Sequence, residues 1–385
     1  MFRIFKIHKG KVNTSEDTSG EKTEERRSLK RWALLTTVIL LIAGGGIGAY
    51  LYEAMIARGN REPEAKYVET NTNPVCYSSE KAFTMALRRD FPELAKKLKG
   101  TVVIPGLDAT RTTLNGFHGI TTCTSMTPQG MAVTEDYIFI SAYCHTKQHN
   151  SVILMLSRHT GSFLKEIVLP DTSHVGGLAY DPVNNNLWVS GGGKGKARAV
   201  AYDMETIETY DLDATERPIR KSQDYLLESI ERNSYMSYAP NALLIGLFQE
   251  NGNATLQRFA MDTAGRLNST VKLSGDRLYE AVNADVLAET SHRIQSVMAT
   301  EKNMLFSKSW GIFDSDLQMY AVWEELSDFK ESAMLKKYSF PQKMEQIYVY
   351  DGKLYCLFES AAYAYRAQPA LKVDRVMIFD EKDLL

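Results

Sequence analysis

The feature that most constrains the fold is a strand–turn–strand pattern that recurs along the chain. It reads QGMAVTEDYIFISAY, then QSVMATEKNMLFSKS, then EQIYVYDGKLYCLFE. Each copy opens with a polar residue, continues as a short apolar run, turns at polar residues and ends in a second apolar run. In each copy the first and last residues lie fourteen positions apart. These pairs are Gln129 and Tyr143, Gln295 and Ser309, and Glu345 and Glu359.

Two further copies and several hairpins complete the pattern. A fourth copy, GGLAYDPVNNNLWVSG, starts at Gly176 with two extra residues in its turn, and a fifth lies around APNALLIGLFQENGNATLQRFAMD. Hairpins such as SVILMLSRHTGSFLKEIVL follow most copies and supply a third and a fourth strand. Four antiparallel strands in roughly 45–60 residues are typical of a propeller blade. A β-sandwich is the alternative, but it requires no fixed spacing. We therefore predict an all-β fold, a five- or six-bladed β-propeller over residues 101–385.

Three segments carry a resemblance to known proteins. PQGMAV and HVGGLAYDP resemble the blade openings of bacterial exported β-propellers of the six-bladed, TolB-like and lactonase-like group, and LYCLFESAAYAY resembles a segment of poorly characterised members. The resemblance covers about residues 100–385. It implies the architecture and a bacterial source, but it leaves the activity open because propellers host many unrelated functions. Lactonase-like members that depend on calcium would hold the ion with inner-ring carboxylates and amides.

A long uncharged run near the start predicts a membrane anchor. ALLTTVILLIAGGGIGAYLY, within residues 33–55, would span about 30 Å as a helix, the thickness of the hydrocarbon core. Residues 1–32 carry nine Lys or Arg against five Asp or Glu, which places the N-terminus in the cytoplasm and the C-terminal domain outside. A cleaved signal peptide is the alternative, but its apolar core would be shorter. Gly44 and Gly48 form a GxxxG that suits a homodimer.

The remaining segments and the charge complete the expected organisation. Residues 1–32 read as a disordered basic tail, 56–77 as a polar stalk and 78–100 as an amphipathic helix. SQDYLLESIERN, residues 222–233, reads as a helix inserted between blades. The formal net charge is −2, so nothing in the composition points to nucleic acid.

The four cysteines, Cys76, Cys123, Cys144 and Cys356, all follow the predicted anchor. An even count outside the membrane permits two disulfides, and three pairings are open. Their spacing shows no CxxC and no matching His, so the sequence does not indicate a zinc site.

The repeated spacing also predicts a ligand site. In a propeller, the start of the first strand and the end of the second lie on one face, so the polar ends of the copies converge at the channel mouth. Plugging the channel and capping strands are the structural alternatives for each residue. The candidate site residues are Gln129, Tyr143, His145, His174, Ser190, Gln295, Ser309, Trp310, Glu345 and Glu359.

Three functions remain open at this stage. We expect a membrane-anchored, extracytoplasmic propeller that binds a ligand or partner, with cell-wall polymer or a surface protein as candidates. A hydrolase is the alternative, in which Glu345 and Glu359 hold calcium for lactonase chemistry or act as acid and base on a glycan. A structural component of a membrane assembly is the third. The sequence favours binding over catalysis and assigns no catalytic residue.

Overall fold

The computed structural model describes residues 45–384 except 66–68, 193–195 and 326–327. The chain divides into two compact units, and the boundary in the sequence lies between Ala57 and Arg58. In the first unit, the described residues are helical. Within the described part of the chain, no helix combines the length and the apolar character needed to span a bilayer. The predicted tail, and residues 33–44 of the predicted anchor with Gly44, lie outside the described residues.

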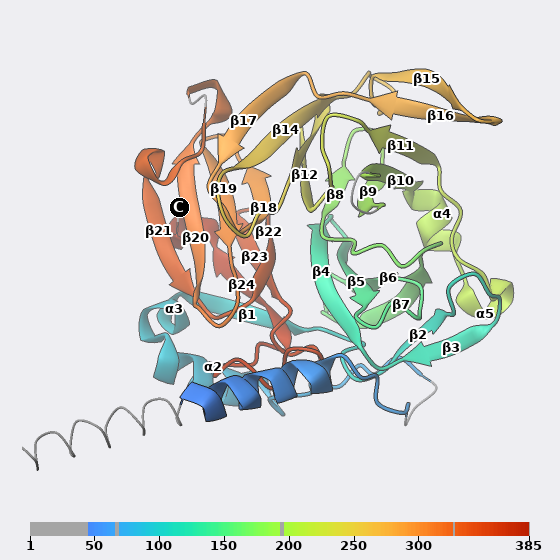
Figure 1. The fold of residues 1–385 in the computed structure, drawn as a ribbon. Helices are drawn as coiled ribbons and strands as arrows, with labels where there is room; N and C mark the ends of the chain where they lie inside the picture. The colour runs from blue at the N-terminus through green and yellow to red at the C-terminus, as the bar shows by residue number, and fades with distance from the viewer. Residues whose placement is uncertain (1–44, 66–68, 193–195, 326–327, 385) are drawn as a thin grey trace, which may run out of the picture. The chain divides into compact units, whose positions relative to one another are not determined.

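The second unit is a β-propeller (Figure 1). Its described residues form five four-stranded blades, each an antiparallel sheet that starts with an inner strand. The first three blades are β4 (Met126–Val133), β5 (Tyr137–Cys144), β6 (Val152–Ser157) and β7 (Phe163–Val168); β8 (Leu178–Asp181), β9 (Asn186–Gly191), β10 (Arg198–Asp203) and β11 (Gln223–Leu227); and β12 (Tyr235–Ala239), β13 (Ala242–Gly246), β14 (Ala254–Ala260) and β17 (Val286–Thr290).

The last two blades close the ring. Strand β1, from the start of the propeller, pairs antiparallel with β24, so the fifth blade contains both ends of the domain. The inner strands β4, β8, β12, β18 and β22 then neighbour one another around the ring. These blades are β18 (Ile294–Ala299), β19 (Asn303–Lys308), β20 (Ser315–Ala321) and β21 (Lys336–Phe340); and β22 (Met344–Tyr350), β23 (Lys353–Phe358), β24 (Arg375–Asp380) and β1 (Leu98–Val103).

This topology confirms the all-β propeller and corrects two details. Five blades are present in the described residues, so the six-blade alternative, which the resembling group shares, is wrong. The propeller also begins at Leu98, three residues before the predicted start. The reason is tertiary: the segment LKGTVV serves as an outer strand of the last blade, and its partner β24 is nearly 280 positions away.

The helices follow local sequence signals. α2 (Glu80–Asp90) begins after Ser79, whose side chain accepts from the backbone N–H of Ala82, and α3 (Pro92–Lys97) follows at once. The predicted amphipathic helix is therefore present but divided, because Pro92 stands at the first helical position of α3 and has no N–H to continue α2. The short helices are α4 (Met204–Thr209), α5 (Leu212–Thr215), α6 (Glu381–Leu384), η1 (Trp323–Glu325) and η2 (Glu331–Ala333).

The helix predicted over residues 222–233 is wrong. Residues Gln223–Leu227 form β11 instead, paired with β10, and Tyr225 and Leu227 are its buried side chains. Burial at every second residue is the period of a strand, and the sheet edge of β10 takes up its backbone groups. A projecting hairpin, β15 (Ser269–Ser274) and β16 (Arg277–Val282), extends this blade, with β16 parallel to β11. A separate hairpin forms from β2 (Thr110–Thr113) and β3 (Ile120–Cys123).

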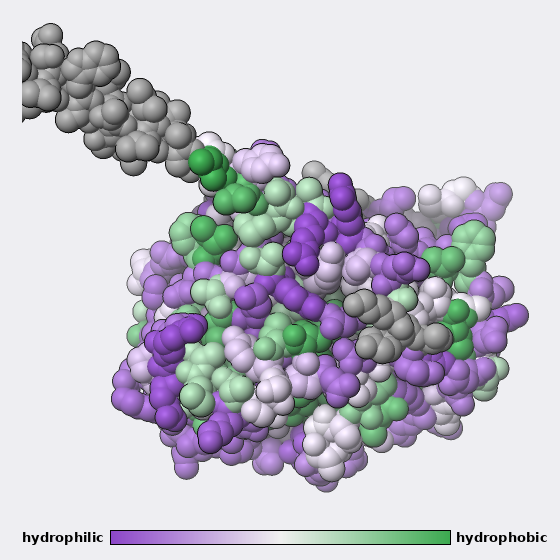
Figure 2. All heavy atoms as spheres, turned by 90° about the horizontal axis from the view of Figure 1, so that it is seen from below, coloured by the Kyte–Doolittle hydropathy of each residue, from purple (hydrophilic) through white to green (hydrophobic). Residues whose placement is uncertain are grey.

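Close packing at the channel depends on glycine at the blade openings. A Cβ added to Gly177, just before β8, would lie 2.3 Å from the backbone nitrogen of Met236 on β12. Only a residue without a side chain lets these two inner strands approach so closely. On the face drawn in Figure 2, the described surface mixes hydrophilic residues with small hydrophobic groups. Scattered apolar side chains of this kind are ordinary on folded proteins, so they do not mark a docking area.

Candidate functional site at the channel mouth

Three inner strands carry a β-bulge at the residues that the repeat places first. The register shifts between Pro128 and Gly130 in β4, between Ile294 and Ser296 in β18, and between Met344 and Ile347 in β22. A bulge adds one residue to one strand and changes where its side chain points, and bulges are common beside binding sites. The extra residues are Gln129, Gln295 and, in β22, one of the pair Glu345 and Gln346.

A cavity of about 300 Å³ opens at this end of the channel. That volume is at the small end of the range for ligand pockets in proteins. Five predicted site residues line it together with residues that the sequence did not single out. The predicted ones are Gln129, His174, Gln295, Glu345 and Glu359, and the others are Gly191, Gly192, Arg232, Asn233, Ser234, Phe248 and Tyr365.

Two buried carboxyl groups form the centre of the site. Glu345 on β22 is 5% exposed, and Glu359, just after β23, is 8% exposed. Gln129 donates from Nε2 to Oε2 of Glu359 at 2.7 Å, which joins the first blade to the fifth. Lys343 Nζ lies 3.7 Å from the other oxygen of Glu359 and 4.1 Å from the centre of the Tyr365 ring. The carboxylate of Glu359 therefore has a partner on each oxygen.

The pKa values of Glu345 and Glu359 are both raised. Burial is the main cause for each, but their neighbours affect the two groups differently. Burial raises the pKa of Glu345 well above its ordinary value, and the nearby charge of Glu359 raises it further. Burial also raises the pKa of Glu359, but Lys343 and the hydrogen bond from Gln129 oppose that rise. Glu345 also shares a hydrogen bond with Glu359. The rise in pKa is therefore greater for Glu345 than for Glu359.

Aromatic rings form one wall behind the carboxyl groups. Tyr143 stacks on His174 with ring centres 4.3 Å apart, and its hydroxyl lies 3.2 Å from Nδ1 of His145. His145 also meets Tyr365 edge to face at 5.4 Å. The charge of Glu359 raises the pKa of Tyr365, and burial raises that of Tyr143, so both phenols stay protonated.

His174 is a neutral group of this wall at physiological pH. Burial among its neighbours lowers the pKa of His174, and the positive charge of Lys147 adds to the effect. The ring is nevertheless open to the solvent of the mouth, which moderates the shift without reversing its direction. A neutral imidazole offers both a hydrogen-bond donor and an acceptor to a molecule in the cavity.

Five predicted site residues do not line the cavity: Tyr143, His145, Ser190, Ser309 and Trp310. Ser190 is buried, and its hydroxyl accepts the backbone N–H of Gly177 at 2.9 Å, which caps a strand junction. Ser309 is also buried, and it accepts a hydrogen bond from Ser315. Trp310 is 36% exposed and lies against the Arg293 guanidinium at 4.3 Å. Tyr143 and His145 stand behind the lining through the ring contacts above.

A polar link between the inner strands depends on a residue that sequence reasoning missed. Gln346 is fully buried, and its side-chain amide spans the channel from β22. Its oxygen accepts from the backbone N–H groups of Met131 at 2.8 Å and Leu178 at 3.0 Å. Its nitrogen donates to the carbonyls of Leu178 at 2.7 Å and Met236 at 3.2 Å. One side chain thus connects four of the five inner strands.

The missed residues carried little signal in the sequence. Gln346 follows Glu345 directly, and only the bulge decides which of the two faces the mouth. Lys343 precedes β22 in a left-handed conformation with a φ of 65°, which no motif marks. Tyr365 lies in the turns after β23, in the segment whose resemblance was noted without a role.

The residues present do not fit a calcium ion. Calcium prefers six to eight oxygen ligands. Here one carboxylate already accepts from the Gln129 amide nitrogen, and a lysine ammonium stands 3.7 Å from it. A cation would meet that positive charge, and burial favours the protonated form of both carboxyl groups. Lactonase chemistry through calcium at Glu345 and Glu359 is therefore not supported by the geometry.

Comparison with known proteins adds little beyond the fold. No family model and no curated protein matches the chain. Kuenenia stuttgartiensis hydrazine synthase is similar at 10% identity and a TM-score of 0.34, over 64% of this chain and 56% of that chain. A Pseudomonas aeruginosa periplasmic gluconolactonase is similar at 12% identity and 0.34, over 58% and 61%. A Bacteroides caccae protein of unknown function is similar at 15% identity and 0.32, over 64% and 81%.

The chain spans less than two thirds of the hydrazine synthase and gluconolactonase chains. Similarity at this level carries no argument about activity, so the propeller architecture rests on the strand topology and the function on the geometry of the mouth.

Proposed function

We propose that the propeller binds a hydroxyl-rich ligand, such as the end of a cell-wall glycan, in the cavity at the channel mouth. One observation carries this proposal: the buried Glu345–Glu359 pair, tied to Gln129, faces an open cavity rather than a closed core. Buried polar groups that only stabilise a fold are normally satisfied within it. A pair that borders a cavity keeps hydrogen-bonding capacity for a molecule inside.

The chemistry of the lining supports a ligand with hydroxyl groups. A hydroxyl both donates and accepts, so it pairs with the carboxylate of Glu359 and with the amide of Gln295 alike. Arg232 adds only donors, and the neutral His174 adds one of each. Phe248 and Tyr365 supply flat apolar surface for the C–H face of a sugar ring. Few polar groups oriented against aromatic rings are the usual composition of such a site.

Display at the cell surface is part of the same proposal. The uncharged run in residues 33–55 and the basic tail before it support a single-pass anchor with the propeller outside the cytoplasm. In that position the mouth would meet cell-wall polymer. Recovery of the full-length protein in the membrane fraction, with the propeller open to external protease, tests this part.

Calorimetric titration of the full-length protein in detergent tests the binding. Soluble peptidoglycan fragments and N-acetylglucosamine oligomers are the probes. We expect saturable binding that weakens at least about tenfold in Glu359→Gln, because a lost charge-assisted hydrogen bond costs about 1.5–3 kcal/mol. Glu93→Gln, on the exposed face of α3, is the matched control and should bind normally. Equal affinity in the wild type and Glu359→Gln would place the ligand elsewhere.

A hydrolase is a second candidate, favoured by the raised pKa values of two adjacent buried carboxyl groups. A neutral acid beside a carboxylate can protonate a carbonyl oxygen while the carboxylate takes a proton from an attacking water. The hydrogen bond between Glu345 and Glu359 brings their carboxyl groups closer than the roughly 5 Å found in retaining glycosidases, so ester or lactone opening fits better than glycan cleavage. A bell-shaped pH profile with nitrophenyl esters or lactones, lost in Glu345→Gln and Glu359→Gln, would establish it.

A further inference from the structure

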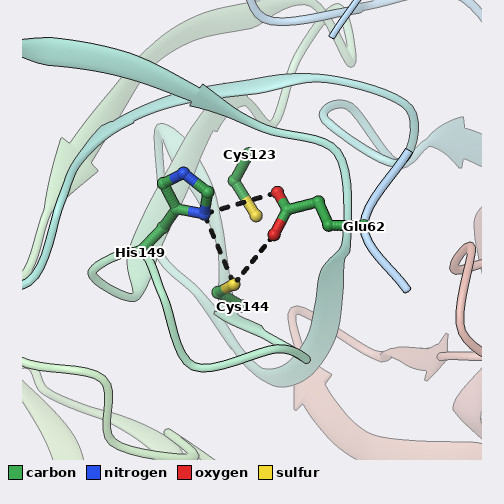
Figure 3. A group of neighbouring side chains, drawn as sticks. All are labelled: Glu62, Cys123, Cys144 and His149. Atoms are coloured by element: carbon green, nitrogen blue, oxygen red, sulfur yellow. Dashed lines mark hydrogen bonds and ion pairs between the residues drawn. The ribbon is translucent and has the colours of Figure 1, made fainter. Parts of the chain in front are cut away.

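A second group of reactive side chains lies apart from the cavity, where three segments of the propeller unit meet (Figure 3). Glu62 comes from the segment before the first blade, Cys123 ends β3, Cys144 ends β5, and His149 lies in the loop that follows. One donor atom from each residue lies within 4.8 Å of the corresponding atom of every other. The cysteine spacing in the sequence, which lacks a CxxC motif, gave no sign of this group.

The measured separations suit a shared tetrahedral ion. Zinc binds sulfur at about 2.3 Å and nitrogen or oxygen at about 2.0–2.2 Å, so tetrahedral ligands stand roughly 3.3–3.8 Å apart. Cys144 Sγ lies 3.5 Å from His149 Nδ1 and 3.7 Å from Glu62 Oε2. His149 Nδ1 lies 3.3 Å from Glu62 Oε1. All three distances fall in that window, and the two oxygens of the Glu62 carboxylate face His149 and Cys144 respectively.

Neighbouring groups hold the ligand atoms in place, as they do around known metal sites. The backbone N–H of Thr124 donates to Glu62 Oε1 at 2.8 Å, and the Thr146 hydroxyl donates to Oε2 at 2.7 Å. The backbone N–H of Ser125 points at Cys123 Sγ at 3.5 Å. Such outer partners fix the orientation of metal ligands and are costly to remove. Glu62 is thus oriented toward the two sulfur atoms although it comes from a distant segment.

Burial and ligand type select the ion. Cys123 and Cys144 are fully buried, His149 is 6% exposed and Glu62 is partly buried, so little of the site is open to bulk water. Two thiolates exclude magnesium and calcium, which prefer oxygen, and an imidazole and a carboxylate complete a set that zinc accepts. Four protein ligands leave no open position for a substrate, which is the arrangement of a structural site.

We propose that Glu62, Cys123, Cys144 and His149 bind one zinc ion that fastens residues 60–65 to the first blade. The loop between Cys144 and His149 also carries His145, which contacts Tyr143 and Tyr365 at the channel mouth. The ion would therefore order a loop that borders the cavity. A disulfide between Cys123 and Cys144 is the competing use of the same sulfur atoms.

Metal analysis of the full-length protein, purified in detergent without chelator, is the direct test. We expect about one equivalent of zinc by mass spectrometry of the metal content, and four free thiols after the ion is removed under denaturing conditions. Chelator should remove the ion from the folded protein, and zinc chloride added back should compete with a chromophoric chelator. A protein that binds no added zinc with its thiols free overturns the proposal, as does a Cys123–Cys144 disulfide in the isolated protein.

Variants separate the site from general effects on folding. Cys144→Ser and Glu62→Gln should each lower zinc affinity at least about tenfold, as loss of a ligand or its orientation does. Cys76→Ser is the matched control, because Cys76 lies outside the group and is bound through its backbone N–H to Asp374. In case a variant fails to fold, cobalt replaces zinc in the wild type: intense visible absorption with sulfur-to-cobalt bands supports tetrahedral thiolate ligation, and their absence contradicts it.

Discussion

Gln129 donates a hydrogen bond of 2.7 Å to Glu359 across 230 positions of sequence, between the first and the last blade of the ring. The contact exists because both residues occupy the mouth end of strands that ring closure brings together. It also opposes the rise that burial causes in the pKa of Glu359. The stability of the closed ring and the charge of the mouth therefore depend on the same amide.

Replacing Gln129 by Leu should destabilise the propeller by about 1–3 kcal/mol, the usual cost when a buried charged group loses a hydrogen bond. Thermal unfolding followed by circular dichroism would measure the change. Gln295→Leu is the matched comparison, since Gln295 occupies the same bulge position in β18 and reaches only the Ser309 carbonyl at 3.4 Å. If both variants lose the same stability, the Gln129 contact contributes nothing specific.

The Glu345 carboxyl should make the fold less stable as pH rises. Its pKa in the folded state lies well above the ordinary 4.5, so the folded state holds the proton more tightly than the unfolded chain does. The stability contributed by this group is greatest below about pH 4.5. It then falls by about 1.4 kcal/mol per pH unit until the pH reaches the pKa of the folded state. Glu345→Gln keeps the shape without the charge and should remove this slope.

Melting temperatures between pH 5 and pH 9 would check the Glu345 prediction. The melting temperature of Glu345→Gln should rise relative to that of the wild type as pH increases. The melting temperature of Glu93→Gln, a change at an exposed position, should match that of the wild type at every pH. If melting temperature depends on pH in the same way for the wild type and Glu345→Gln, ionisation of Glu345 does not destabilise the fold and the prediction is wrong.

Gln346→Leu should be among the most damaging single changes in the channel. The substitution leaves the backbone N–H groups of Met131 and Leu178, and the carbonyl of Met236, without the partner they have now. Each buried orphan costs about 1–3 kcal/mol, and we expect a total loss of roughly 2–5 kcal/mol. Denaturant unfolding measures it. A loss below about 1 kcal/mol would mean that water replaces the amide in the channel.

Gly177→Ala should destabilise the ring by steric overlap. The added Cβ would meet the backbone nitrogen of Met236 at 2.3 Å, and backbone cannot move aside without separating β8 from β12. Overpacking of this kind costs about 1–3 kcal/mol or more. Gly100→Ala in β1 is the control, because nothing lies within 4 Å of its added Cβ. Equal melting temperatures for the two variants would contradict the close approach of the inner strands.

The local pattern of apolar and polar residues in the sequence was sufficient to predict the repeating part of the fold. Alternating apolar runs with turn residues between them predicted strand pairs, and their fixed spacing predicted blades. The same spacing placed Gln129, Gln295 and Glu345 at one end of the channel, where bulges now hold them. The prediction failed for residues 222–233, where YLLESI suits either a helix or a strand and the open edge of β10 decided the outcome.

The blade as a unit follows from the sequence, because strand period and turn chemistry act between residues that are near neighbours in the chain. The number of blades depends on long-range pairing, since β1 must reach β24 to close the ring. The tertiary structure also decided which polar residues meet, as with Lys343 beside Glu359, or Glu62 beside Cys144. Such contacts depend on ring closure and on the paths of the loops, so they cannot be predicted from a periodic pattern in the sequence.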